Sequence, residues 1–97
     1  MLFGNKIKEL RDEQGVLQRQ LAALLEIDTP MFSKIERGDR KAKREKLEKL
    51  AGYFHQDEKE MLTLWIADKF IDAVKDVQER ELCVIAIVFA QEKIMTM

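Results

Sequence analysis

The segment over residues 17–38, LQRQLAALLEIDTPMFSKIERG, constrains the fold of this chain more than any other stretch. It predicts two short helices joined by a tight turn at residues 26–28, with Gly38 ending the second helix. Apolar side chains share one face of each expected helix: Leu21, Ala22 and Leu25 on the first, and Phe32 and Ile35 on the second. Such helices bury a common apolar seam, which leaves the outer face of the second helix free. That outer face carries Thr29, Ser33 and Lys34.

Charge is distributed unevenly along the chain, although 17 basic and 18 acidic residues give a net charge of only −1. Residues 1–54 carry 12 basic and 9 acidic side chains, whereas residues 55–97 carry 5 and 9. Between Lys34 and Lys49 there are 8 basic residues and 4 acidic ones. A basic stretch beside a helix that can enter a major groove is suited to contacts with DNA phosphates. The alternative is a solvated, lysine-rich helix face.

The size of the chain, 97 residues of which 46% are apolar, allows one domain with a small core, or one domain with a helical extension. A chain this short often gains stability from a partner subunit. The first 16 residues mix charged and apolar side chains, unlike a signal peptide. The longest apolar run, LCVIAIVF at residues 82–89, is shorter than the roughly 20 residues that cross a bilayer. We therefore expect a soluble, cytoplasmic protein that contacts no membrane.

Residues that carry catalytic or metal chemistry are scarce in this chain. Cys83 is the only cysteine, so the chain has no internal disulfide, and its place in the apolar run favours a buried, inert thiol. His55 is the only histidine and is expected at a helix end rather than as a metal ligand. Ser33 is the only serine, so the residues for a catalytic triad are lacking, as is a glycine-rich phosphate loop. We expect no enzymatic activity, no cofactor and no metal.

Apolar periodicity and helix stop signals predict an all-α chain, with helices over residues 3–14, 18–25, 28–37, 44–54, 57–74 and 78–94. Gly15 and Gly38 are expected to end helices in the left-handed conformation. Thr29 is favoured over Asp28 as the N-cap of the third helix, because the residue before Pro30 avoids helical backbone. The composition of residues 82–89 also allows a strand, but the flanking helix formers and the lack of a partner strand favour a helix.

The two C-terminal helices are more apolar than one small core requires. The helix over 78–94 is apolar on most sides and must therefore be buried on most sides. The charge changes sign near residues 55–57, which predicts a domain over residues 1–56 and a helical extension over residues 57–97. We expect this extension to form a homodimer interface through Trp65, Phe70, Leu82, Ile85, Val88 and Phe89. The alternative is that the extension only covers the N-terminal core.

The Ile-Glu-Arg-Gly exit at residues 35–38 stands in register with the helix before it and with the LxxLA helix after it. The residues that carry this pattern are Ile7, Leu10, Arg11, Gly15, Leu17, Gln18, Leu21, Ala22, Leu25, Ile27, Ser33, Ile35, Glu36, Arg37, Gly38, Arg40, Leu47, Leu50 and Ala51. Over residues 3–56 the chain resembles the Cro/phage-repressor helix-turn-helix family, also called the xenobiotic-response-element family. The resemblance implies a lambda-repressor-like bundle of about five helices, with a C-terminal helical extension.

The resemblance also implies a role for each matching residue. Phosphate contacts would come from Gln18, Arg19, Arg37, Arg40, Lys41 and Lys43. Base edges in the major groove would be contacted by Thr29, Pro30, Ser33 and Lys34, of which Lys34 could donate to guanine O6 or N7. Arg11 and Glu36 match a position of phage repressors where an ion pair ties the first helix to the end of the third. We expect these two side chains within salt-bridge distance, in a structural role.

The chain departs from the family pattern at two places. Glu26 stands where the family usually has glycine, so either a non-glycine residue takes positive φ there or the turn differs slightly. The third helix lacks the paired Gln or Asn that reads adenine in some phage repressors, so the DNA sequence preference of those repressors does not transfer.

Together these features predict a transcriptional regulator, a repressor or a controller of the restriction–modification type, that binds double-stranded DNA. As a homodimer it would place two recognition helices, each over residues 28–37, in successive major grooves of a pseudo-palindromic operator, about 34 Å apart. The alternative is an antitoxin-like or other interaction module whose C-terminal helices hold a partner protein.

Overall fold

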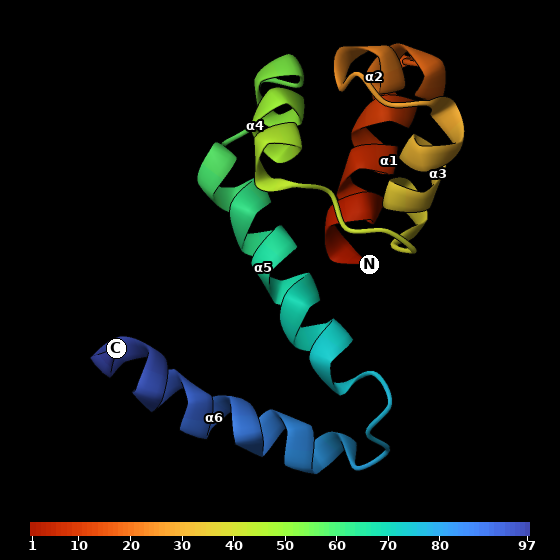
Figure 1. Ribbon diagram of the computed structural model, residues 1–97. Coiled ribbons are helices and arrows are strands. Elements are labelled where there is room, and N and C mark those ends of the chain that lie inside the picture. Colours follow the sequence, from red (N-terminus) through yellow and green to blue (C-terminus); the bar gives the residue numbers. More distant parts are fainter.

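The computed structural model describes residues 1–97 and consists of six helices with no strand (Figure 1). The helices are α1 (Leu2–Gln14), α2 (Gln18–Leu24), α3 (Thr29–Arg37), α4 (Arg44–Tyr53), α5 (Glu58–Val74) and α6 (Arg80–Thr96). The predicted all-α class is confirmed. Residues 82–89 lie within α6, so the alternative of a strand in this apolar run is wrong.

The bounds of the helices agree with the predicted ones to within two residues, and both predicted glycine stops are present, but the N-cap of α3 differs. Gly15 and Gly38 end α1 and α3 with left-handed φ values of 65° and 82°. The N-cap of α3 is Asp28 and not Thr29, because Asp28 Oδ1 accepts a hydrogen bond from the Met31 amide at 2.7 Å. A carboxylate at the positive end of a helix satisfies an otherwise free amide, which outweighs the preference of Thr29 for extended backbone.

The hydrophobic core lies between the first four helices and the first turn of α5. It consists of fourteen buried residues: Phe3, Ile7, Leu10, Leu21, Ala22, Leu25, Phe32, Ile35, Ala42, Leu47, Leu50, Ala51, Phe54 and Met61. The apolar stripes predicted on the first four helices all lie in this core. Burial of these side chains therefore fixes α3 against α1 and α2 and determines which face of α3 is turned outward.

Helices α1 and α3 approach each other closely at Gly4. A methyl group added at Gly4 would lie 2.9 Å from the carbonyl oxygen of Ile35 and would overlap with the carbonyl oxygen of Glu36. The absence of a side chain at this position is what allows the N-terminal turn of α1 to cross the end of α3.

Helix α5 is attached to the N-terminal bundle through one buried carboxylate, that of Asp68. Its Oδ1 accepts a hydrogen bond from the amide of Leu2 at 2.8 Å, and its Oδ2 accepts one from the amide of Phe3 at 3.0 Å. Met1 provides no side-chain cap for α1. Asp68 therefore satisfies two of the free amides that begin α1, although it lies more than sixty residues away in the chain.

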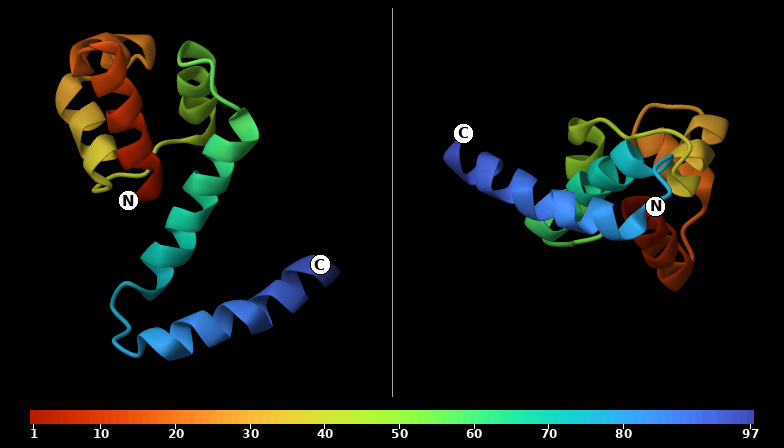
Figure 2. Two further views of the ribbon diagram at one scale, coloured as in Figure 1. Left: turned by 180° about the vertical axis from the view of Figure 1, so that it is seen from behind. Right: turned by 90° about the horizontal axis from the view of Figure 1, so that it is seen from below.

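Helix α6 projects from the end of α5 and is separate from the bundle formed by α1–α4 (Figures 1 and 2). None of its residues is buried, and only Cys83 and Ala90 are half-buried. The expectation that Cys83 is fully buried is therefore wrong for the single chain, because α6 has too little of its own chain packed against it.

The expected dimer residues fall into two groups in this fold. Trp65 is half-buried: it packs against the core of its own chain, and its indole donates a hydrogen bond to the carbonyl oxygen of Ala42, so its place in a dimer interface stays a prediction. Phe70, Leu82, Ile85, Val88 and Phe89 are exposed, with 41% to 71% of each residue accessible. The alternative that the extension covers the N-terminal core holds for α5 only: Met61 is part of the core and Leu62, Leu64 and Trp65 pack against it, whereas no residue of α6 does.

Candidate nucleic-acid interface

Helix α3 presents a polar outer face because its apolar face is fixed in the core. Phe32 and Ile35 are buried on the inner side. The four residues predicted to contact bases lie on the remaining surface: Thr29, Pro30 and Lys34 are exposed, and Ser33 is half-buried. The sequence pattern and the fold therefore place these four side chains together on one accessible face.

The end of α3 carries a small polar cluster of Ser33, Arg37 and Asp39. Arg37 Nη1 donates a hydrogen bond to Ser33 Oγ at 3.1 Å, and Arg37 Nε donates one to Asp39 Oδ2 at 3.1 Å. The ion pair between Arg37 and Asp39 is exposed on both sides. Exposed pairs contribute little to stability, so Arg37 can exchange Asp39 for a DNA phosphate at small cost.

A second polar cluster joins α1, α2 and α3 beneath this face. The expected contact between Arg11 and Glu36 is present: Arg11 Nε and Nη2 donate to Glu36 Oε2 and Oε1 at 2.9 Å and 3.0 Å. The hydrogen bond from Arg11 to Glu36, reinforced by the opposite charges, holds the pKa of the Arg11 guanidinium above its ordinary value, against the opposing effect of burial. Two parallel hydrogen bonds of this kind fix orientation as well as distance.

Gln18, predicted to contact phosphate, is part of the same cluster. Its Nε2 donates a hydrogen bond to Glu36 Oε1 at 3.0 Å. The start of α2 is capped by another side chain, that of Gln20, whose Oε1 accepts a hydrogen bond from the backbone amide of Leu17 at 2.7 Å. Gln18 therefore links the start of α2 to α3, and the second hydrogen of its Nε2 group is left to donate to a phosphate. Arg19 next to it is exposed.

The turn between α2 and α3 contains a strained residue. Glu26 has a φ of 57°, the left-handed conformation that the family usually gives to glycine. Of the two alternatives that the sequence left open, the structure therefore has the positive φ at a non-glycine residue. The geometry matters because it sets the angle at which α3 leaves the core.

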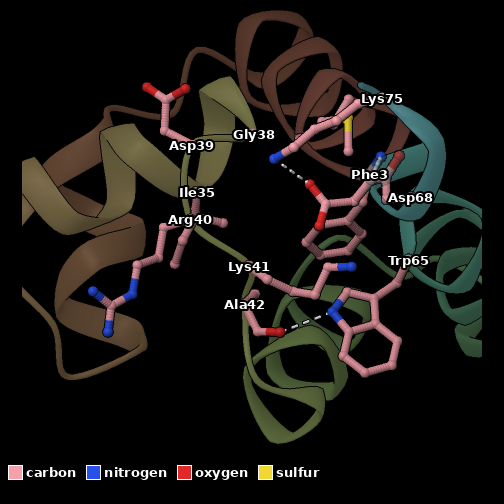
Figure 3. Close-up of a pocket in the computed structure, with 13 residues that line it drawn as sticks. Phe3, Ile35, Gly38, Asp39, Arg40, Lys41, Ala42, Trp65, Asp68 and Lys75 are labelled. Atoms are coloured by element: carbon pink, nitrogen blue, oxygen red, sulfur yellow. Dashed lines mark hydrogen bonds and ion pairs between the residues drawn. The ribbon is translucent and has the colours of Figure 1, made fainter. Parts of the chain in front are cut away.

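The loop between α3 and α4 carries the other predicted phosphate contacts, Arg40, Lys41 and Lys43. All three are exposed, and none forms an ion pair within the chain. The loop is held by its buried residue Ala42, whose carbonyl oxygen accepts a hydrogen bond from Trp65 Nε1 at 2.8 Å (Figure 3). Unpaired cations on an anchored loop beside α3 are suited to hold DNA phosphates.

The Trp65 ring also lies between two lysines, one from the loop and one from α5. Lys69 Nζ is 4.1 Å from the ring centroid, and Lys41 Nζ is 5.9 Å from it. Both distances are within the range of cation–π attraction. Figure 3 shows Lys41 lying towards the indole, whereas Arg40 lies away from it.

A polar cavity of about 500 Å³ lies behind this loop, between the start of α1 and α5 (Figure 3). Its carboxylates already have partners: Asp68 accepts the α1 amides, and Asp72 pairs with Lys75 Nζ at 2.9 Å. The hydrogen bond from Lys75 lowers the pKa of Asp72 and in turn raises the pKa of Lys75. The cavity therefore offers a ligand no free buried charge.

A comparison with known families bears on this geometry. The model of a family described as helix-turn-helix matches residues 7–60, which is more than half of the chain. The chain belongs to the Cro/phage-repressor helix-turn-helix family. It is accordingly a DNA-binding regulator in general terms. No curated protein and no solved structure matches the chain.

The family match ends in the first turn of α5, so that most of α5 and all of α6 lie outside it. No helix is long and apolar enough to cross a membrane. No group of three or more His, Cys, Asp or Glu side chains is arranged to hold a metal ion.

Proposed function

We propose that this protein is a sequence-specific transcriptional regulator that binds a pseudo-palindromic operator as a homodimer. The observation that carries the proposal is the free outer face of α3, flanked by exposed cations that form no ion pair in the chain. Lys34 is exposed on this face and can donate to O6 or N7 of guanine. Thr29 and Pro30 offer apolar groups to the methyl group of thymine.

Phosphate contacts in this proposal come from both sides of α3. Arg19 lies at the start of α2, while Arg40, Lys41 and Lys43 lie on the loop that follows α3. Gln18 and Arg37 contribute once their contacts with Glu36 and Asp39 are shared or exchanged. Contacts on both sides of a recognition helix set its register in the groove without reading sequence. The proposed role is non-catalytic.

Dimerisation follows from the size of a helix-turn-helix half-site. One recognition helix reads only a few base pairs, so two half-sites about 34 Å apart give a dimer its specificity. We expect a repressor or controller of its own gene, because compact members of this family without a ligand domain commonly act in this way.

One observation favours a second candidate, an antitoxin-like interaction module. Helix α6 exposes apolar side chains, including Phe89 with 71% of its surface accessible. Such a surface can hold a different protein instead of a second copy. In that case DNA binding would be secondary to complex formation.

Fluorescence anisotropy distinguishes these candidates. The full chain is titrated against a labelled duplex from the region upstream of its own gene and against a random duplex of equal length. Tight binding with preference for the upstream duplex supports the regulator, and the affinity should fall by about three orders of magnitude between about 50 mM and 200 mM salt. Equal and weak binding to both duplexes would refute it and favour the interaction module.

A further inference from the structure

The exposed apolar surface of this protein is concentrated at its C-terminal end. Sixteen large apolar residues are exposed, and only Leu2, Leu17 and Tyr53 belong to the N-terminal bundle. The other thirteen lie between Ile66 and Met97, on α5, α6 and the segment joining them. Contiguous apolar surface on this scale marks a contact with another molecule.

Helix α6 has no polar face. Val84 and Phe89 are 64% and 71% exposed, and they lie roughly 140° apart around the helix axis. The remaining directions are occupied by Leu82, Ile85, Ile87 and Val88, each with about half or more of its surface accessible. A helix that is apolar on all sides is stable in water only when several elements surround it. Contact on one flat face would leave half of α6 uncovered.

An apolar hollow lies where α6 passes α5. It has a volume of about 220 Å³ and is lined by Phe70 of α5 and by Ile87, Ala90, Gln91, Ile94 and Met95 of α6. Figures 1 and 2 show that the two helices diverge from the segment that joins them, so that the hollow lies on the inner side of an open angle. An apolar helix entering this angle would meet α5 on one side and α6 on the other.

We propose that the occupant of this hollow is α6 of a second copy of the chain, so that the two copies interlock. Each α6 then lies between α5 and α6 of its partner, and the four helices form one bundle with a shared apolar core. This arrangement deepens the homodimer of the proposed function, on which it rests. It gives α6 a neighbour on more than one side, which a contact between two flat faces does not.

The charges on α6 agree with a second copy as the occupant. The helix carries Arg80 and Lys93 against Glu81 and Glu92, a balance of zero, with both signs at each end. Two copies therefore meet without net repulsion in either direction.

The size of the exposed apolar surface also agrees with a second copy of the chain as the occupant. A stable interface of standard size uses about 20–30 residues and about 800 Å² on each partner. Thirteen large apolar residues from Ile66 to Met97 are exposed, which is enough to form the apolar centre of an interface of that size. The hydrophobic core of the N-terminal bundle includes no residue of α6, so this surface is available without unfolding the DNA-binding part.

The test measures the mass of the full chain by light scattering, without DNA, across a series of concentrations. The wild-type protein should have twice the mass of one chain, which is 11.4 kDa. Val84→Glu and Phe89→Glu place a charge on two different sides of α6, and Phe70→Glu places one at the hollow on α5. Each should weaken the dimer by about tenfold or more, because each charge would be buried in the bundle. Tyr53→Glu, at an exposed aromatic residue outside this surface, should leave the dimer intact.

Several results would overturn the interlocked dimer. These are a monomeric wild-type protein, a wild-type protein that is soluble only with another protein, or an intact dimer in any of the three variants. If only one of Val84→Glu and Phe89→Glu dissociates, the contact is one flat face. Circular dichroism and the fluorescence of Trp65 check that the N-terminal bundle of each variant is folded.

Binding of a single half-site duplex separates this inference from the proposed function. Monomeric variants that still bind the half-site show that α3 reads DNA independently of the dimer. Loss of sequence preference in a protein that remains dimeric would instead refute the proposed function and leave the interlocked dimer standing.

Discussion

The indole Nε1 of Trp65 lies 2.8 Å from the carbonyl oxygen of Ala42 and donates a hydrogen bond to it. This contact joins α5 to the loop that carries Arg40 and Lys41, although most of α5 lies beyond the end of the family match. The position of the predicted phosphate contacts therefore depends on α5 as well as on the helix-turn-helix itself.

Trp65→Phe should destabilise the protein by about 1–3 kcal/mol, because Ala42 is buried and its carbonyl oxygen would lose its partner. The aromatic ring is kept, so the packing against the core changes little. Urea denaturation measures the loss, and Tyr53→Phe serves as an exposed control. DNA affinity should fall equally for specific and random duplexes, because the contacts proposed for the loop are with phosphates. Unchanged stability and affinity would show that the hydrogen bond does not hold the loop.

Asp68→Asn should destabilise the protein by about 1–3 kcal/mol. Asparagine keeps one acceptor for the amides of Leu2 and Phe3 but turns an NH₂ group towards the other amide, leaving it without a partner in a buried place. Thermal unfolding followed by circular dichroism measures the effect. Asp76→Asn, at an exposed site, should change stability by no more than about 0.5 kcal/mol. Equal effects of the two substitutions would contradict the capping role of Asp68.

Two glycines in helices should respond to alanine in opposite directions. Gly4→Ala should be strongly destabilising, by about 1–3 kcal/mol, because the new methyl group would overlap with the carbonyl oxygen of Glu36 and force α1 away from α3. Gly52→Ala should be stabilising by about 0.5–1 kcal/mol, because nothing lies near its new methyl group and alanine favours the helix. Urea denaturation measures both effects: the midpoint of Gly4→Ala should lie below that of the wild type, and the midpoint of Gly52→Ala should lie above it. A stable Gly4→Ala variant would mean that α1 and α3 can separate at low cost.

Local patterns were sufficient to predict much of this fold. The apolar stripes of the first four helices, the glycine stops and the contact between Arg11 and Glu36 depend on short spacings or on a family position, and all are present in the structure. What the sequence did not predict depends on contacts between distant segments. In the sequence Asp68 is one more charged residue of an amphipathic helix, and only the fold places it beside the start of α1. Gly4 likewise shows no turn signal that would mark a close helix crossing.

The C-terminal extension shows the same difference between local patterns, which the sequence predicts, and contacts between distant segments, which it does not. The sequence predicted helices, and α5 and α6 are helices. It could not predict that Trp65 turns inward while Phe70 remains exposed, because one wide apolar stripe is compatible with both arrangements. At the start of α3, the effect of Pro30 on the backbone of Thr29 favours Thr29 as the N-cap. The N-cap is Asp28, because the hydrogen bond that its side chain accepts from the Met31 amide outweighs that effect.

Lys34→Ala and Arg40→Ala should have different effects on DNA binding. Lys34 lies on the outer face of α3, so its removal should weaken the preferred site by about 1–3 kcal/mol and relax sequence preference at one base pair. Arg40 lies on the loop, so its removal should weaken specific and random duplexes alike and reduce the salt slope by about one. Anisotropy titrations on both duplexes at two salt concentrations measure these effects. Identical behaviour of the two variants would show that α3 does not read the bases.

Glu26→Gly should stabilise the protein, against the usual effect of adding glycine. Glu26 holds a φ of 57°, which costs a non-glycine residue about 1 kcal/mol or more, whereas glycine adopts it freely. Part of this gain is lost to the greater freedom of glycine in the unfolded chain, so the net stabilisation should be about 0.5–1 kcal/mol. Glu48→Gly, which makes the same substitution on the exposed side of α4, should destabilise by about 1 kcal/mol. Urea denaturation measures the change in stability of each variant. Changes of opposite sign would locate the strain in the turn before α3. A destabilised Glu26→Gly variant would show that the turn is not strained.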